Sequence, residues 1–144
     1  MPKSLFDVII VGGSYAGLSA ALALGRTLFK VLIIDAGERC NKVVLHSRNL
    51  LTHDGSAPAD IAATAKEQVL KYKTVEFLDA RVVSAMKKDG IFEVVTEAEE
   101  KFTGRKLLFT TGVKDKMLLI PGFAECWGKS LLQCPFCHGY EVQG

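Results

Sequence analysis

Two cysteines and a histidine near the end of the chain have the spacing of a reactive centre. Residues 134–141 read CPFCHGYE, so two residues separate the thiols and His138 follows at once. A C-x-x-C-H stretch has three chemical interpretations: a redox dithiol, half of a zinc site, or a haem attachment signature. Two buried thiols without chemistry are the fourth possibility. The spacing alone leaves all four open.

The rest of the sequence separates these interpretations. Zinc usually takes four ligands, and Trp127-Gly128 beside Cys126 offers no second C-x-x-C pair. Haem attachment would require export and a distal axial ligand, and the sequence indicates neither. A redox dithiol requires only Cys134 and Cys137, since two intervening residues permit a small disulfide ring. The dithiol therefore needs the fewest assumptions, and we expect no metal site.

His138 adds proton chemistry to this dithiol. Thiol–disulfide exchange proceeds by attack of a thiolate on a disulfide sulfur. Imidazole is the side chain that exchanges a proton near neutral pH. His138 can therefore protonate a leaving thiolate or accept the proton of the attacking thiol. We assign catalytic roles to Cys134, Cys137 and His138.

A second candidate site lies near the start, where the apolar run FDVIIVGG ends in a glycine-rich turn. The turn, GGSYAG, comprises Gly12, Gly13, Ser14, Tyr15, Ala16 and Gly17. A dinucleotide-binding turn needs a strand, a glycine bend and a helix that begins at the pyrophosphate. Gly12 suits the bend and Gly17 suits close helix packing. Ser14 replaces the second glycine of G-x-G-x-x-G, with a side chain small enough to admit a phosphate and a hydroxyl that can donate to it.

The end of the next apolar run supplies the expected acidic residue. Asp35 follows Gly12 by 23 residues and is succeeded by Ala36 and Gly37. The dinucleotide fingerprint places an acid at about 20 residues, where it bonds the ribose hydroxyls. An Asp rather than an Arg or Lys argues against a 2′-phosphate. FAD or NAD is therefore favoured over NADP at this turn.

The intervening segments predict an α/β fold. We expect strands over 6–13 and 30–37 with a helix between them from Ser14, a βαβ unit. The irregular stretch 38–57 is long enough to suggest a functional loop. A helix should run from Pro58 to about Tyr72, followed by a hairpin around Asp89-Gly90. A last buried strand is expected over 106–112, and a loop over 120–128.

Composition sets the broad class. The 144 residues are 49% hydrophobic and 24% charged, with a net charge of +2, which suits one globular domain. This charge does not favour nucleic acid. We expect no secretory signal and no membrane span, because no apolar run approaches about 18 residues. Four cysteines in such a chain indicate a reducing, cytoplasmic location.

Three motifs in order, FDVIIVGGSYAGLSAALALGR, KLLFTTGV and CPFCHGYE, resemble the low-molecular-weight thioredoxin reductases. These are FAD-dependent pyridine nucleotide-disulfide oxidoreductases, and the resemblance covers essentially the whole chain. It implies a Rossmann-like FAD-binding domain with a parallel sheet and a small β-hairpin or meander insertion. It also implies that the glycine turn holds the FAD pyrophosphate and that Asp35 holds the adenosine ribose.

Further site residues follow from the resemblance alone. Cys137 would face the flavin and Cys134 would attack the substrate. The loop after the second strand would approach the flavin, with Asp54-Gly55 shaping it. The remaining cofactor contacts implied are Lys42, His46, Asn49, the backbone of Val82, and the turn residues Thr111 and Gly112.

The implied activity passes electrons between NAD(P)H, FAD and the Cys134–Cys137 disulfide. The partner would be a thioredoxin-like protein or a small-molecule disulfide or dithiol, and the protein a homodimer. His138 departs from the Asp that follows the second cysteine in thioredoxin reductases proper, which puts thioredoxin in doubt. Two alternatives are a dithiol oxidase that uses oxygen and a non-catalytic FAD-binding module.

The chain also has about half the family's length. Residues 1–114 would be the N-terminal part of the FAD domain. Residues 115–144 would form a crossover and the start of an NAD(P)H-type domain that carries the dithiol.

Overall fold

The computed structural model describes residues 5–41 and 44–143, so Lys42 lies outside the described residues. The chain divides into two compact units. The first, here called the sheet unit, comprises Met1–Arg39 and Ala62–Gly112. The second, the dithiol unit, comprises Cys40–Ile61 and Val113–Gly144.

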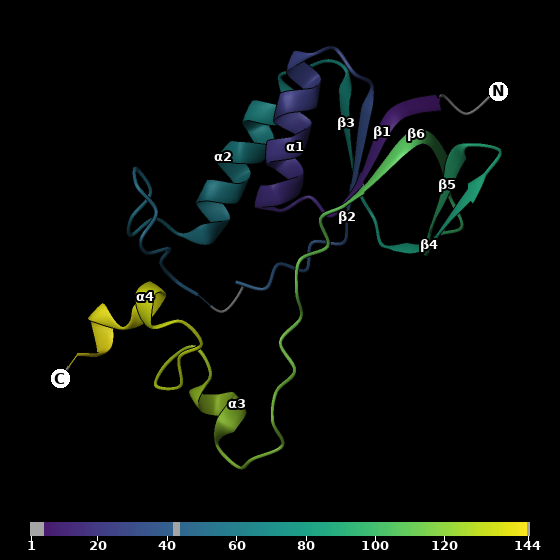
Figure 1. Cartoon of the computed structure of the whole chain (residues 1–144). Coiled ribbons are helices and arrows are strands. Elements are labelled where there is room, and N and C mark those ends of the chain that lie inside the picture. Colours follow the sequence, from purple (N-terminus) through teal and green to yellow (C-terminus); the bar gives the residue numbers. More distant parts are fainter. Residues whose placement is uncertain (1–4, 42–43, 144) are drawn as a thin grey trace. The chain divides into compact units, whose positions relative to one another are not determined.

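The sheet unit is built on six strands in the order β3-β2-β1-β6-β5-β4 (Figure 1). The first four in that order run parallel, whereas β5 is antiparallel to both β6 and β4. This arrangement confirms the predicted α/β class with a mostly parallel sheet and a small meander. The strands are β1 (Leu5–Val11), β2 (Val31–Asp35), β3 (Val75–Asp79), β4 (Val82–Lys88), β5 (Ile91–Thr96) and β6 (Lys101–Phe109).

Two helices pack on one face of this sheet, as Figure 1 shows. Helix α1 (Tyr15–Arg26) connects β1 to β2, and α2 (Pro58–Leu70) precedes β3. The predicted helices therefore exist, although α2 ends two residues before Tyr72. Ser14 occupies the N-cap position of α1, but its side chain makes no capping hydrogen bond.

The apolar runs of the first two strands are continuous because both faces of the sheet are buried. Alternate residues such as Val8 and Ile10 point to the helices, where they meet Leu18, Ala21 and Val69. The intervening side chains, Ile9 among them, lie in a second cluster with residues of the β4–β5 hairpin. That cluster is Phe6, Ile9, Leu32, Ile34 and Val94. These two clusters fix the strand ends that carry the glycine turn and Asp35.

The hairpin turn has the backbone that its sequence predicts. Asp89 and Gly90 join β4 to β5 with φ angles of 50° and 80°. Positive φ at both central residues belongs to the type I′ turn, whose twist matches that of the flanking strands. The β4–β5 hairpin is therefore confirmed at the predicted position.

The final strand differs from the predicted buried strand over 106–112: it ends at Phe109, and Lys106, Leu108 and Phe109 are exposed. Strand β6 begins at Lys101 rather than at Lys106. Its first residues pair with antiparallel β5, while the stretch from Thr103 to Phe109 pairs with parallel β1. The early part has one polar, partly exposed face, so it lacks the apolar run on which the prediction depended.

The dithiol unit has short elements: α3 (Phe123–Cys126), α4 (Pro135–His138) and the 3-10 turn η1 (Tyr140–Val142). The predicted loop over 120–128 therefore contains one helical turn. Phe123 and Trp127 stack there with ring centroids 5.6 Å apart. Across residues 5–41 and 44–143, no helix has the length and apolar character needed to cross a bilayer.

Candidate active site

At two positions of the glycine turn between β1 and α1, an added side chain would clash with the backbone. Gly12 has φ 105°, and a Cβ added there would clash with the carbonyl oxygen of Thr110. A Cβ at Gly17 would clash with the carbonyl oxygen of Gly12. The bend and the close helix approach that the sequence predicted are therefore both present.

The middle of the turn is open to a ligand. Ser14 has φ −88°, which any side chain tolerates, and is half-buried, while Tyr15 and Ala16 are exposed. The carbonyl of Ser14 already accepts the Leu18 N–H at 2.9 Å, so α1 begins directly at the turn. Amide groups in the first turn of a twelve-residue helix favour anions. These residues fit the pyrophosphate of a dinucleotide.

Asp35 is held beside the turn. Its Oδ1 accepts the backbone N–H of Gly13 at 2.9 Å. An added Cβ on Gly13 would lie 2.8 Å from the Asp35 Cβ, so the two backbones are in close approach. A carboxylate has more acceptor positions than this one bond uses. Asp35 therefore has capacity for the hydroxyl groups of a ribose, and exposed Ala36 and Gly37 follow it.

Three more predicted contacts belong to the sheet unit. Val82 opens β4, two residues after Ala80, whose N–H donates to the Asp35 carbonyl at 2.9 Å. Thr111 and Gly112 are exposed and lie just beyond β6, after Thr110. Thr110, just before them, bonds to the glycine turn through its hydroxyl, 2.7 Å from the Gly12 carbonyl. The structure thus brings the end of β6 to the turn.

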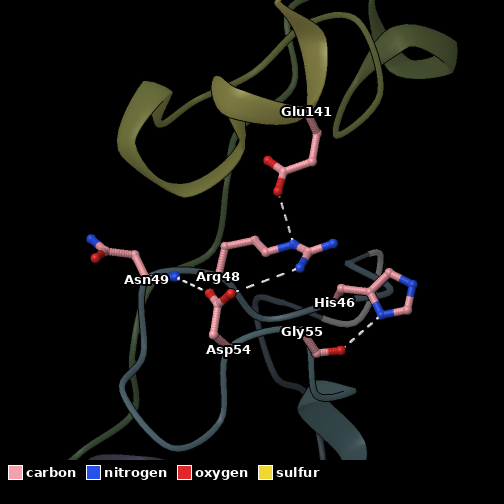
Figure 2. Close-up of polar contacts among 6 residues, drawn as sticks. All are labelled: His46, Arg48, Asn49, Asp54, Gly55 and Glu141. Carbon is pink, nitrogen blue, oxygen red and sulfur yellow. Dashed lines mark hydrogen bonds and ion pairs between the residues drawn. The ribbon is translucent and has the colours of Figure 1, made fainter.

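The loop residues form a second group, in the dithiol unit (Figure 2). His46 Nδ1 lies 3.0 Å from the Gly55 carbonyl, which can only accept, so Nδ1 carries the proton. The Asn49 N–H donates to Asp54 Oδ1 at 2.8 Å. Asp54 and Gly55 thus hold the loop closed, as the sequence suggested, with His46 and Asn49 on it.

Cys134 and Cys137 form a disulfide whose Cα atoms are 5.3 Å apart. Cys134 precedes α4 and Cys137 lies inside it, and both residues are half-buried. Cys40 and Cys126 are free thiols. No group of three potential metal ligands occurs among the residues that the structure describes.

A cavity of about 170 Å³ adjoins the disulfide, within the dithiol unit. Both disulfide cysteines and His138 line it, so an entering group meets sulfur and imidazole together. The sequence did not point to several of its other lining residues, Cys40, Asn41 and Trp127 among them. Cys40 and Asn41 lie near the start of the irregular stretch 38–57. The length of that stretch was the one feature of the sequence that suggested a functional role for them. The full lining is Cys40, Asn41, Val44, Val113, Asp115, Trp127, Gly128, Leu132, Gln133, Cys134, Cys137 and His138.

Comparison with known proteins identifies the family. Residues 6–143 match the pyridine nucleotide-disulphide oxidoreductase family, to which the chain therefore belongs. Thioredoxin reductase tcpT of Claviceps purpurea is 41% identical over 145 residues, covering 99% of this chain and 45% of the relative. Thioredoxin reductase aclD of Aspergillus oryzae is 39% identical over 147 residues, covering 100% and 46% respectively.

Similarity to solved structures supports the same family. The crystal structure of an oxidoreductase from Agrobacterium tumefaciens has a TM-score of 0.93 and 44% identity, covering 97% of this chain and 48% of that one. The chain thus spans less than half the length of the relatives named here. The family match confirms the predicted resemblance and the oxidoreductase class. It implies FAD and NAD(P)H as cofactors.

Proposed function

We propose that this chain binds FAD and carries the redox dithiol of a thioredoxin reductase-like disulfide oxidoreductase. One observation carries the proposal: the Cys134–Cys137 disulfide shares a cavity with His138. The same chain has a glycine turn that fits a dinucleotide. Neither feature alone requires electron transfer, but together they favour it.

The sheet unit would hold most of the cofactor. Bound FAD would supply the two-electron chemistry that exchanges with the disulfide, with NAD(P)H as the electron donor of the longer protein. Gly12 and Gly17 shape the turn, Ser14 can donate to a phosphate, and Asp35 can accept from the ribose. The proposed cofactor contacts are Gly12, Gly13, Ser14, Tyr15, Ala16, Gly17, Asp35, Ala36, Gly37, Lys42, His46, Asn49, Val82, Thr111 and Gly112.

The dithiol performs the exchange with the substrate. In the reduced form, the Cys134 thiolate attacks one sulfur of an external disulfide, forming a mixed disulfide and releasing a thiolate. The Cys137 thiolate then attacks Cys134 Sγ, which releases the second substrate thiolate and restores the Cys134–Cys137 bond. Two cysteine thiols are thereby oxidised as one external disulfide is reduced to two thiols.

His138 would transfer protons to and from the thiols during exchange. It adjoins Cys137 in the chain and lines the same cavity. An imidazolium there can protonate the departing thiolate, and the neutral ring can accept the proton of the attacking thiol. This role requires only that the substrate sulfur enter the cavity.

The substrate is a thioredoxin-like protein or a small-molecule disulfide or dithiol. His138, in place of an Asp, favours a small molecule and supports a second candidate function, an oxygen-using dithiol oxidase. Hydrogen peroxide formed from a dithiol without NADPH would identify the oxidase. We further propose a cytoplasmic homodimer, which sedimentation can test. Residues 1–114 would belong to the FAD domain, and 115–144 would begin an NAD(P)H-type domain.

FAD binding and dithiol exchange can be tested separately. Quenching of FAD fluorescence by the chain measures the first, and thiol titration before and after reduction measures the second. We expect saturable FAD binding and two thiols that appear together on reduction, at Cys134 and Cys137. FAD binding without paired thiol reactivity would leave a non-catalytic FAD-binding module instead.

A further inference from the structure

An ion pair joins the two sequence segments of the dithiol unit. Arg48 Nε lies 2.9 Å from Glu141 Oε1, and Figure 2 shows the guanidinium between Glu141 and Asp54. Arg48 comes from the loop that contains His46, whereas Glu141 closes the CPFCHGYE motif. Both side chains are about one-third exposed. The pair is therefore placed to connect the loop to the dithiol segment.

The loop is a firm support for Arg48. Its neighbour Ser47 exchanges two backbone hydrogen bonds, accepting from the Gly55 N–H at 2.7 Å and donating to the Ser56 carbonyl at 2.8 Å. Asp54 accepts the Asn49 N–H and lies 4.0 Å from the Arg48 guanidinium. Residues on both sides of Arg48 are thus held across the loop, which limits where its side chain can reach.

Glu141, the other residue of the pair, lies close in the chain to the disulfide. Glu141 lies in η1, which follows α4 after Gly139. The Gly139 N–H donates to the Pro135 carbonyl at 2.7 Å, so the two turns are consecutive. Helix α4 has only four residues, and a helix this short is not stable by itself. Its geometry must therefore come from tertiary anchors such as Glu141.

We propose that Arg48 is a positioning residue of the dithiol centre: by pairing with Glu141 it holds α4 in the conformation that brings Cys134 to Cys137. The inference rests on the proposed redox function of these cysteines. Anchoring matters most in the reduced state, where no S–S bond holds the turn together. Without the anchor the reduced segment frays and its two thiols meet less often, so the disulfide becomes easier to reduce.

The test measures the equilibrium between the full chain and glutathione redox buffers. Alkylation followed by peptide mass analysis reports Cys134 and Cys137 separately from Cys40 and Cys126. Arg48→Met and Glu141→Ala should each lower the equilibrium constant for disulfide formation about threefold, the size expected of an ion pair whose side chains are about one-third exposed. The double variant, Arg48→Met with Glu141→Ala, should lower the constant no further than either single change, because both act through the same ion pair. Arg105→Met, which removes the Arg105–Asp7 pair of the sheet unit, is the matched control and should change nothing.

The direction in which each single variant shifts the equilibrium constant distinguishes a positioning role from a direct effect of charge on the thiolates. Loss of an anchor shifts both variants the same way, whereas a field effect on the thiolates would shift Arg48→Met and Glu141→Ala in opposite directions. Opposite shifts, unchanged constants, or additive shifts in the double variant would each overturn the inference. If the wild-type cysteines fail to titrate as a pair, the proposed function fails as well.

Discussion

The Thr110 hydroxyl donates to the Gly12 carbonyl at 2.7 Å and lies 3.2 Å from the Val11 carbonyl. One side chain at the end of β6 therefore fixes the turn at the end of β1, 98 residues earlier in the chain. Thr110 is therefore a structural contact of the glycine turn.

Replacing Thr110 by Val should loosen that turn. Thr110→Val keeps the shape but removes the donor, which should lower the free energy of unfolding by about 1 kcal/mol. FAD affinity should also fall, because the turn that we propose binds the phosphates loses this hydrogen bond. Thr110→Ser retains the hydroxyl and should match the wild type. Urea denaturation and FAD fluorescence quenching measure the two effects, and equal values for Val and Ser would refute the role.

Asp35 should matter for both stability and cofactor binding. Asp35→Ala leaves the Gly13 N–H without its acceptor, at a cost of about 1–3 kcal/mol in unfolding free energy. It also removes the proposed ribose contact, so FAD affinity should drop. Asp79→Ala is the matched control, since Asp79 pairs with Asp35 in the sheet but has an exposed side chain. An FAD titration in which both variants bind equally would contradict the ribose assignment.

Gly17 tests the close approach of α1. Ala usually stabilises a helix interior relative to Gly by about 1 kcal/mol. At Gly17 the added methyl would meet the Gly12 carbonyl, so Gly17→Ala should instead destabilise the protein by about 1–3 kcal/mol. The exposed Ser19→Ala in the same helix should leave thermal stability nearly unchanged. A rise in melting temperature for Gly17→Ala would show that the packing is looser than described.

The two cysteines should behave differently as single variants. Reduced Cys137→Ser should accumulate a mixed disulfide at Cys134 when treated with oxidised glutathione, because no second thiol resolves it. Cys134→Ser should form far less adduct at Cys137. Mass spectrometry distinguishes the products, with Cys40→Ser in both backgrounds to remove an exposed thiol. Equal amounts of adduct at both positions would contradict the assignment of Cys134 as the attacking thiol and Cys137 as the resolving thiol.

Much of the sheet unit follows from local sequence. The runs at Phe6 and Val31 are continuous because helices and hairpin bury both faces, and glycine or proline marks the boundaries. Asp89-Gly90 specifies its turn directly. The first half of β6 was missed because an antiparallel pairing with β5 needs no continuous apolar run.

The dithiol unit could be predicted less well. CPFCHGYE marks the reactive centre, but the partners of that centre come from distant positions. Arg48 meets Glu141 across 93 residues, and Cys40 and Trp127 join the cavity from separate segments. A charge or a thiol in an irregular stretch has no periodicity that indicates its partner.

Anaerobic reduction of the FAD-loaded chain with dithionite tests the central claim most directly. A flavin takes up two electrons and a disulfide two more, so the wild type should consume twice the reductant that the flavin alone requires. The Cys134→Ser variant should consume only the dithionite that the flavin requires. Its flavin absorbance should change as much as that of the wild type. Equal consumption by the two proteins would show that the Cys134–Cys137 disulfide does not exchange electrons with the cofactor.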